Sequence, residues 1–345
     1  MNIRNLLFIF LIAICSINAQ KLAIPEHVTS FKGQQVTGVT VSTQGRIFAN
    51  FPRWRKTVVN SVVEVQNDGS ALPYPNKKWN QWQPNEPVSD SVFVAVQSVV
   101  AFENRLYVLD TRNPLWQGVV DAPRIFVFNL KTNQLETILK LSDGSYKPNS
   151  YTNDLCIDKK NQALYITDSN EAGLIVYNLN SNSSRRVLDN HFSTKAETNH
   201  LTIDGSIWGG KPVHSDGIAF DAKKGILYFH ALTGYTLYAI PSSILCDGTS
   251  SAIERKVSKI TKTPAPDGMV FAPNGNLYLA DLEKHKIVFL NSKKQLQTLA
   301  EGKTVGWADT FSVFGDYLYF TNSKIHQAKG DISNIAFTIQ KIKIN

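Results

Sequence analysis

Cysteine is scarce in this sequence of 345 residues, which contains three. Cys15 falls in an apolar stretch at the N-terminus, so Cys156 and Cys246 are the two that belong to the body of the chain. Two thiols exclude the framework of several disulfides that stabilises many small secreted domains. We expect two buried free thiols, with a single disulfide between them as the alternative.

Concentrated positive charge is also missing. The chain carries 36 Lys and Arg against 28 Asp and Glu, a net charge of +8, but its basic residues are scattered. Nucleic-acid binding usually requires a concentrated basic face, so we expect no nucleic-acid partner. Hydrophobic residues make up 43% of the chain and charged residues 19%. This balance excludes intrinsic disorder and supplies a sizeable core.

A long hydrophobic run occurs only at the start of the chain. Arg4 precedes an apolar stretch at residues 6–15, and a small residue, Ala19, follows shortly after it. This pattern predicts a signal peptide over residues 1–19. The stretch is shorter than the roughly 20 apolar residues that span a bilayer, and no later stretch is long enough. We therefore expect a secreted protein, extracellular or periplasmic, with no membrane insertion.

Helical periodicity is almost absent after the predicted signal peptide. Short alternating or apolar runs, separated by turns rich in Asn, Asp, Gly and Lys, predict many β-strands. One of these strands carries a Leu-Tyr pair that recurs every 41–63 residues, roughly the period of a propeller blade. The pairs are Leu106-Tyr107, Leu164-Tyr165, Leu227-Tyr228, Leu277-Tyr278 and Leu318-Tyr319, with Ile47-Phe48 as a weaker first copy.

Further strands follow most copies of the pair, which gives four antiparallel strands per repeat. Such a unit is a propeller blade. Six copies predict an all-β fold, a six-bladed β-propeller of four-stranded antiparallel blades that forms one domain over residues 20–345. We expect the C-terminal run at residues 335–344 and a strand near residues 21–24 to share the last blade, which would protect its edge.

One position, upstream of each pair, is acidic in four of the six copies. Its occupants are Thr37, Gln97, Asp154, Asp216, Asp267 and Asp309. Because the innermost strands of a propeller line its central channel, we expect these side chains to converge at one mouth of the channel. Carboxylates brought together in a partly dry site must take up protons or bind a cation. The alternative is that each aspartate caps its own turn.

Other residues near the same strand ends are candidates for the walls of a pocket. They are Trp307, Phe311, Tyr151, His214, His230 and Asn322. The sequence contains no Gly-rich phosphate loop, no His-Glu-x-x-His helix and no serine nucleophile elbow. Ser215 follows His214 directly, and strand neighbours point to opposite faces, so we discount a catalytic triad there.

Several segments resemble the major royal jelly protein/Yellow family. They include Asn50-Phe51-Pro52-Arg53-Trp54, Arg105-Leu106-Tyr107-Val108-Leu109-Asp110-Thr111, Tyr165-Ile166-Thr167-Asp168-Ser169 and Trp307-Ala308-Asp309-Thr310-Phe311-Ser312. The resemblance runs through the mature chain and implies a secreted six-bladed propeller. Family members include pigmentation-linked proteins, nutritive jelly proteins and salivary proteins that bind biogenic amines in the channel. The cysteine that insect members carry before the Arg-Leu-Trp motif is absent, because Glu103 and Asn104 precede Arg105.

A more distant resemblance connects the chain to the gluconolactonase/senescence-marker group of six-bladed enzymes. That resemblance implies a divalent cation, calcium or zinc, held by Asn153, Asp216 and Asp267. Thr37 stands where the group has a glutamate ligand in its first blade.

Three functions follow from these observations. The leading hypothesis is a propeller that binds a small cationic or polar-aromatic ligand, with Asp154, Asp216, Asp267 and Asp309 supplying charge and Trp307 and Phe311 supplying ring contacts. The alternative is a metal-dependent lactonase-type hydrolase that uses a divalent cation in the same channel, so the sequence leaves open whether the protein is an enzyme. The third is an interaction protein that uses its outer surface, including residues 73–87, which we expect to be a packed loop. The oligomeric state stays open.

Overall fold

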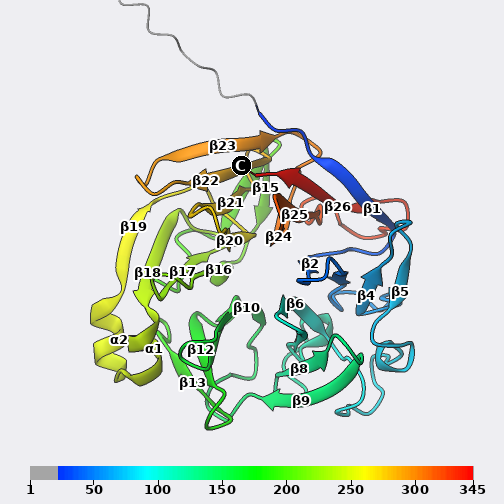
Figure 1. Ribbon diagram of the computed structural model, residues 1–345, viewed down its shortest axis with the longest axis horizontal. Coiled ribbons are helices and arrows are strands. Elements are labelled where there is room, and N and C mark those ends of the chain that lie inside the picture. The colour runs from blue at the N-terminus through cyan, green and yellow to red at the C-terminus, as the bar shows by residue number, and fades with distance from the viewer. Residues whose placement is uncertain (1–21, 345) are drawn as a thin grey trace, which may run out of the picture.

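Antiparallel strands account for most of the regular structure in the computed structural model, which describes residues 22–344. Six sheets of four strands surround a central axis, with one strand of each sheet nearest the axis (Figure 1). The predicted all-β, six-bladed propeller is therefore confirmed. The predicted signal peptide over residues 1–19 lies outside the described residues.

Blades 1 to 5 are each built from four strands consecutive along the chain, running outward from the axis. Blade 1 contains β2 (Gly38–Val41), β3 (Ile47–Asn50), β4 (Val62–Val65) and β5 (Ala71–Pro73). Blade 2 contains β6 (Val96–Phe102), β7 (Arg105–Asp110), β8 (Arg124–Asn129) and β9 (Gln134–Lys140). Blade 3 contains β10 (Thr152–Asp158), β11 (Ala163–Asp168), β12 (Gly173–Asn178) and β13 (Ser183–Val187).

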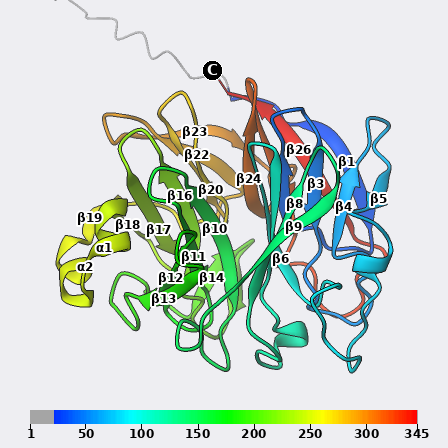
Figure 2. The same ribbon diagram turned by 60° about the horizontal axis from the view of Figure 1, so that its bottom comes forward.

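Blade 4 contains β16 (Ser215–Asp221), β17 (Ile226–Ala231), β18 (Thr236–Pro241) and β19 (Ser258–Lys262). Two short helices, α1 (Ser242–Asp247) and α2 (Ser250–Lys256), connect β18 to β19 at the outer rim (Figure 1 and Figure 2). Blade 5 contains β20 (Met269–Phe271), β21 (Leu277–Asp281), β22 (Lys286–Leu290) and β23 (Leu296–Glu301).

The sixth blade joins the two ends of the described chain. It contains β24 (Ala308–Phe314), β25 (Tyr317–Asn322), β26 (Ala336–Lys343) and, at the outer edge, β1 (Glu26–Lys32). Strand β1 runs antiparallel to β26, with Phe31 opposite Phe337 (Figure 1). The shared last blade is confirmed, although the N-terminal strand begins at Glu26 and not near residues 21–24. Blade 6 also contacts blade 1, because the Thr321 hydroxyl donates to the Thr37 carbonyl oxygen at 2.6 Å.

Burial explains why the repeat is visible in the sequence. The leucine of every Leu-Tyr pair is at most 2% exposed, and all six residues of β11 are buried. Second strands of blades are covered on both faces because neighbouring blades pack face to face. Each fully buried leucine contributes about 1.5–3 kcal/mol of transfer free energy, so the apolar pattern recurs in each blade.

A hairpin interrupts the repeat between blades 3 and 4. Its strands are β14 (His200–Ile203) and β15 (Ser206–Gly209). Asp204 and Gly205 form its two-residue turn with φ of +51° and +72°, as a tight hairpin turn requires. Leu201 and Ile203 pack into the same buried cluster as residues of blades 5 and 6. The hairpin therefore crosses to the far side of the ring from blade 3 and is fixed there by apolar contacts.

The segment at residues 73–87 is a packed loop, as expected. Tyr74 and Trp82 are 3% and 4% exposed, and the ring of Trp79 lies 5.1 Å from that of Phe93, between ring centroids. These aromatic contacts fill the outer part of the interface between blades 1 and 2.

The described residues contain two free cysteines, Cys156 and Cys246. Within the same residues no helix is long and apolar enough to cross a membrane.

Candidate functional site

Bulges in the inner strands set the direction of the predicted acidic residues. The pairing register shifts between Thr152 and Leu155 in β10, between Ser215 and Ile218 in β16, and between Ala308 and Phe311 in β24. Asp154, Asp216 and Asp309 all lie inside these irregular stretches. A bulge leaves residues unpaired and changes the direction of their side chains. Asp216 and Asp309 are the first residues of their bulges, and the equivalent first residue in β10 is Asn153, one position before Asp154.

Two glycines allow the inner strands to approach closely at this level. A Cβ atom on Gly217 would lie 2.8 Å from the backbone oxygen of Asp267, and one on Gly268 would lie 2.8 Å from that of Asp309. Real Cβ atoms do not tolerate such contacts, so glycine is required after both Asp216 and Asp267. The Asp-Gly pairs of the sequence therefore bring carboxyl groups of neighbouring blades together.

An axial cavity of about 360 Å³ opens at this end of the inner strands. Every blade, or a loop attached to it, contributes to its walls. Its carboxyl groups belong to Asp216, Asp267 and Asp309, and its aromatic rings belong to Trp54, Trp116, Tyr151, Trp208 and Trp307. The cavity therefore combines an acidic surface with a largely aromatic wall.

The aromatic wall forms two groups. Trp116 stacks on Tyr151 with 3.8 Å between ring centroids, and Trp54 stacks on Trp116 at 6.0 Å. On the other side, Trp208 of the inserted hairpin contacts Trp307 edge-on at 4.7 Å. Flat rings facing a cavity with carboxyl groups are suited to bind a cation that carries an apolar or aromatic body.

A chain of hydrogen bonds fixes one side of the cavity. The Trp54 indole N–H donates to the Tyr151 hydroxyl, and that hydroxyl donates to Oε1 of Gln97 at 2.7 Å. The Gln97 amide donates in turn to Oδ1 of Asn153 at 2.7 Å. Because each member holds the next, these side chains are held in place without a ligand.

The three carboxyl groups of the cavity are buried and only partly satisfied. Asp216, Asp267 and Asp309 are 2%, 4% and 6% exposed. The Trp307 indole N–H donates to Oδ2 of Asp267 at 2.6 Å, whereas Oδ1 of Asp216 has no hydrogen-bond partner among the described residues. An unpaired buried carboxyl oxygen costs free energy, so Oδ1 of Asp216 is an acceptor that a donor in the cavity would satisfy.

Burial raises the pKa of these groups. It raises the pKa of Asp267 to about 8, with a further contribution from the charge of Asp154. Burial and the charge of Asp267 raise the pKa of Asp216 and of Asp309 well above the ordinary value. Ionisation of these carboxyl groups is therefore disfavoured, and a cation placed between them would favour it.

The structure brings together some of the predicted site residues and separates others. Asp216, Asp267, Asp309, Trp307 and Asn153 line the axial cavity. Asp154 and Phe311 line a second cavity instead, of about 470 Å³, formed by later residues of the inner strands. Burial raises the pKa of Asp154 to about 6. The bulge in β10 thus presents Asn153 to the axial cavity and Asp154 to the second one.

Among the other residues expected to wall a pocket, Tyr151 lines the axial cavity and three do not. His214 accepts a hydrogen bond from the Ala196 backbone N–H at 3.0 Å. His230 lies 2.8 Å from the Thr263 hydroxyl, and the Asn322 amide oxygen accepts from the Trp307 backbone N–H. These three side chains have structural partners.

Three aromatic residues of the cavity were not predicted. Trp54 and Trp116 lie in connections outside the strands, and Trp208 lies on the inserted hairpin. None of them occupies a position that repeats between blades. The one available signal was Trp54, which ends the family-like segment Asn50-Phe51-Pro52-Arg53-Trp54.

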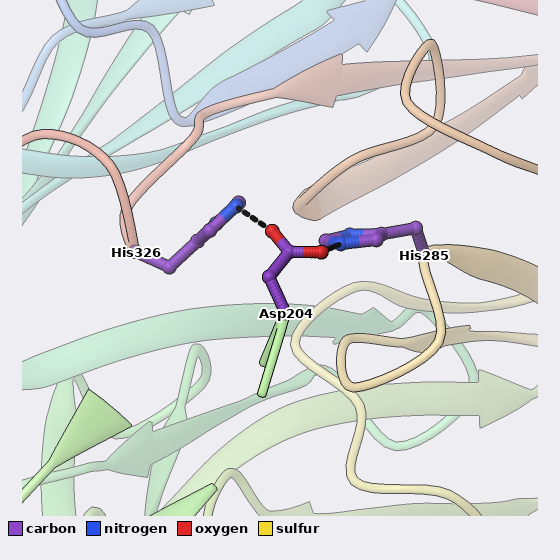
Figure 3. A group of neighbouring side chains, drawn as sticks. All are labelled: Asp204, His285 and His326. Carbon is purple, nitrogen blue, oxygen red and sulfur yellow. Dashed lines mark hydrogen bonds and ion pairs between the residues drawn. The ribbon is translucent and has the colours of Figure 1, made fainter. Parts of the chain in front are cut away.

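A second cluster of ionisable side chains lies outside the axial cavity. Within residues 22–344, one group of three His, Cys, Asp or Glu side chains brings its ligand atoms within 4.8 Å of one another, and it consists of Asp204, His285 and His326 (Figure 3). The metal site predicted at Asn153, Asp216 and Asp267 stays a prediction. These three residues share a cavity, but Oδ1 of Asn153 already accepts from Gln97.

The fold and the site define a six-bladed propeller with an acidic, aromatic-walled axial cavity. The family model described as "Major royal jelly protein" matches residues 94–331, more than half of the chain. The chain belongs to the major royal jelly protein family, so the resemblance stated from the sequence is confirmed.

The curated relatives share low identity with this chain. Dopaminechrome tautomerase of Drosophila melanogaster is 24% identical over 226 residues, which cover 58% of this chain and 46% of the relative. Major royal jelly protein 3 of Apis mellifera is 23% identical over 250 residues, which cover 69% and 45%. The chain thus spans about half the length of the curated relatives it matches.

Solved structures support the fold. A luciferin-regenerating enzyme aligns with a TM-score of 0.56 and 11% identity over 93% of this chain and 95% of that chain. A streptogramin B lyase aligns with a TM-score of 0.54 and 14% identity over 93% and 98%. At these identities the similarity shows a common fold and nothing about the chemistry.

Proposed function

We propose that this protein is secreted and that its axial cavity binds a small organic cation, an ammonium group attached to an aromatic or apolar body. The observation that carries the proposal is Oδ1 of Asp216, a buried carboxyl oxygen without a partner among the described residues, in a cavity that also contains Asp267 and Asp309. A protonated amine supplies both the hydrogen-bond donor and the positive charge that this group lacks.

The charge balance of the cavity supports a cationic ligand. Its three carboxyl groups face one positively charged side chain, Arg55, at the wall. Arg55 is already engaged, because its guanidinium donates to Oε1 of Gln35 at 2.6 Å and to the Ala328 carbonyl oxygen. A ligand cation would therefore be the partner that allows the buried carboxyl groups to ionise.

The shape and lining of the cavity set the size of the ligand. A volume of about 360 Å³ lies at the lower end of the range of small-molecule sites. Trp116 is 51% exposed and stacks on the buried Tyr151, so the aromatic wall reaches from the surface into the cavity. A single aromatic ring with a short aminoalkyl chain fits these dimensions and contacts.

The test compares three probes that differ in charge and share a phenyl ring: phenethylamine, phenethyl alcohol and phenylacetate. Tryptophan fluorescence of the mature chain would report binding, because four tryptophans line the cavity. We expect phenethylamine to bind at least about tenfold more tightly than the alcohol, a difference of ~1.4 kcal/mol, and phenylacetate not to bind. Equal affinity for the amine and the alcohol would exclude a cation site.

The lactonase alternative has weaker support in this cavity. Calcium takes about six to eight oxygen ligands, but Oδ1 of Asn153 and Oδ2 of Asp267 already accept hydrogen bonds from Gln97 and Trp307. A calcium ion that used these two oxygens would compete with both hydrogen bonds. Lactone hydrolysis that is abolished by a chelator and restored by calcium or zinc would favour this alternative over amine binding.

A further inference from the structure

We propose that Asp204, His285 and His326 form a binding site for a divalent transition-metal ion of the zinc type, distinct from the axial cavity and independent of the function proposed for it. The three side chains come from segments far apart in the sequence. In Figure 3 the two imidazole rings approach the Asp204 carboxylate from opposite sides. They form the one such group of ligand atoms within the described part of the chain.

Rigid elements hold the three ligands. Asp204 occupies the two-residue turn between β14 and β15, and His285 directly precedes β22. His326 follows β25 in the connection to β26. Each side chain thus sits at or close to the end of a hydrogen-bonded strand, and the group joins the inserted hairpin to blades 5 and 6.

The distances fit a tetrahedral ion. Nε2 of His285 lies 2.9 Å from Oδ1 of Asp204, and Nε2 of His326 lies 3.7 Å from Oδ2 of the same carboxylate. Zinc binds nitrogen and oxygen at about 2.0–2.2 Å in a tetrahedral arrangement, which places neighbouring ligand atoms roughly 3.3 Å apart. The observed separations lie on either side of this value, so small side-chain rotations would complete the site.

The hydrogen bonds around the two rings show which contacts a bound ion would keep and which it would replace. Nδ1 of His285 lies 3.2 Å from the Gly306 carbonyl oxygen, to which it donates. Such a bond at the far nitrogen fixes the tautomer that metal-binding histidines use. Nε2 of His285 lies 2.9 Å from Oδ1 of Asp204, and Nε2 of His326 lies 3.0 Å from the Gln327 amide nitrogen. A bound ion would replace both contacts, so the Gln327 amide has to turn away from His326.

The two histidines of the site are largely buried, whereas the aspartate is exposed. The side chains of His285 and His326 are 16% and 8% exposed, whereas that of Asp204 is 62% exposed. A cavity of about 320 Å³ adjoins all three residues. The two imidazoles are therefore held in place while the carboxylate remains open to an arriving ion. Two nitrogen donors favour zinc over calcium or magnesium, which prefer oxygen.

Lys303 and Lys324 also border this cavity. Their ammonium groups repel a bare cation, so the negative charge of Asp204 is required to balance them. The same positive charges would favour an anionic fourth ligand such as hydroxide.

A tryptophan next to the site can report metal binding through its fluorescence. The indole ring of Trp307 stacks on His326 with 5.8 Å between centroids and an interplanar angle of 16°. Cobalt and copper ions, which have open d shells, should therefore quench its fluorescence, whereas zinc should not.

The experiment titrates chelator-treated mature chain, without a histidine tag, with Zn²⁺ in competition with a chromophoric chelator. We expect one Zn²⁺ per chain, and a loss of affinity of at least about tenfold in both Asp204→Asn and His285→Gln, because removing a ligand should cost at least as much as removing a group that supports one. Asp204 is exposed, so Asp204→Asn should fold normally even if the histidine variant does not. His27→Gln changes an exposed histidine on β1 and serves as the matched control.

Asp216→Asn distinguishes this site from the axial cavity. The proposal expects Zn²⁺ affinity to be unchanged in Asp216→Asn and phenethylamine binding to be unchanged in Asp204→Asn. Absence of stoichiometric Zn²⁺ binding would overturn the proposal and leave the cluster as an ordinary pair of His–Asp contacts. Zn²⁺ binding that survives Asp204→Asn but is lost in Asp216→Asn would overturn it as well, because the ion would then belong to the axial cavity.

Discussion

The indole N–H of Trp307 donates a hydrogen bond of 2.6 Å to Oδ2 of Asp267. This bond connects a ring of the aromatic wall to a carboxyl group of the acidic surface, and it fixes both side chains toward the axial cavity. This bond and a side-chain hydrogen bond with Asp216 favour the ionised Asp267 carboxylate, whereas burial and the charge of Asp154 raise its pKa. The bond therefore contributes to how readily the Asp267 carboxyl group ionises beside a cation.

Replacing Trp307 by phenylalanine tests how much this hydrogen bond contributes to ligand binding. Trp307→Phe removes a donor to a buried carboxyl group, which should cost about 1–3 kcal/mol of unfolding free energy and weaken phenethylamine binding. Chemical denaturation and fluorescence titration would measure the two effects. Trp79→Phe is the control, because Trp79 packs between blades 1 and 2: it should lower stability and leave the affinity intact. Equal losses of affinity in both variants would contradict the assigned role.

The acidic residues should differ in their importance for binding. Asp216→Asn removes the carboxyl group whose Oδ1 has no hydrogen-bond partner among the described residues, so phenethylamine affinity should fall about tenfold or more, as expected for a lost charge-assisted contact. Asp154→Asn alters the second cavity and should change the affinity by less than about threefold, within the weaker range of screened charges. Isothermal titration of both variants would check this order. The opposite order would place the ligand in the second cavity.

Stability should depend on pH through the buried carboxyl groups. The folded-state pKa of Asp267, about 8, lies above the ordinary value of 3.8. Between these values the folded chain binds more protons than the unfolded chain, so this group lowers the stability of the empty protein as pH rises. Asp267→Asn removes the effect. Thermal unfolding should show a variant that matches the parent near about pH 4 and exceeds it by a few degrees near about pH 8.5.

The opposite trend, with the parent more stable than Asp267→Asn at high pH, would mean that Asp267 is ionised and paired in the empty protein. The difference between the two proteins is the informative quantity, because all other titrating groups are common to both.

Close packing at the Asp-Gly pairs can be tested directly. Gly268→Ala would place a Cβ atom 2.8 Å from the backbone oxygen of Asp309, so the inner strands of blades 5 and 6 must separate. We expect a loss of about 1–3 kcal/mol, typical of overpacking, together with weaker ligand binding. At Gly275 an added Cβ meets no atom within 4 Å, although φ is +85°. Gly275→Ala should therefore lose stability through backbone strain alone and keep its affinity for phenethylamine.

The repeat of the fold was predictable because it has a physical cause in every blade. The leucine of each Leu-Tyr pair is buried between blades, and the carboxyl group of Asp110 or Asp168 accepts backbone hydrogen bonds at the end of the same strand. Such requirements recur at equivalent positions and leave a pattern in the sequence. The alignment of the copies then also identified Asp216, Asp267 and Asp309 as neighbours.

The rest of the site was not predictable, because it depends on local departures from the repeat. The bulge in β10 decides that Asn153 and not Asp154 faces the axial cavity, and no sequence pattern signals a bulge there. Trp208 and Asp204 lie on a hairpin that has no counterpart between the other blades. Their contacts with Trp307 and His285 arise from the packing of that hairpin, which periodicity does not report.

Proton release on ligand binding tests the central claim most directly. The account holds that a cation enters a cavity whose carboxyl groups are protonated when it is empty. Calorimetric titration with phenethylamine near about pH 7, in two buffers of different ionisation enthalpy, should therefore show release of protons to the buffer, and Asp216→Asn should diminish both the release and the affinity. Binding of equal strength in the parent and in Asp216→Asn, with identical heats in both buffers, would contradict the proposed cation site.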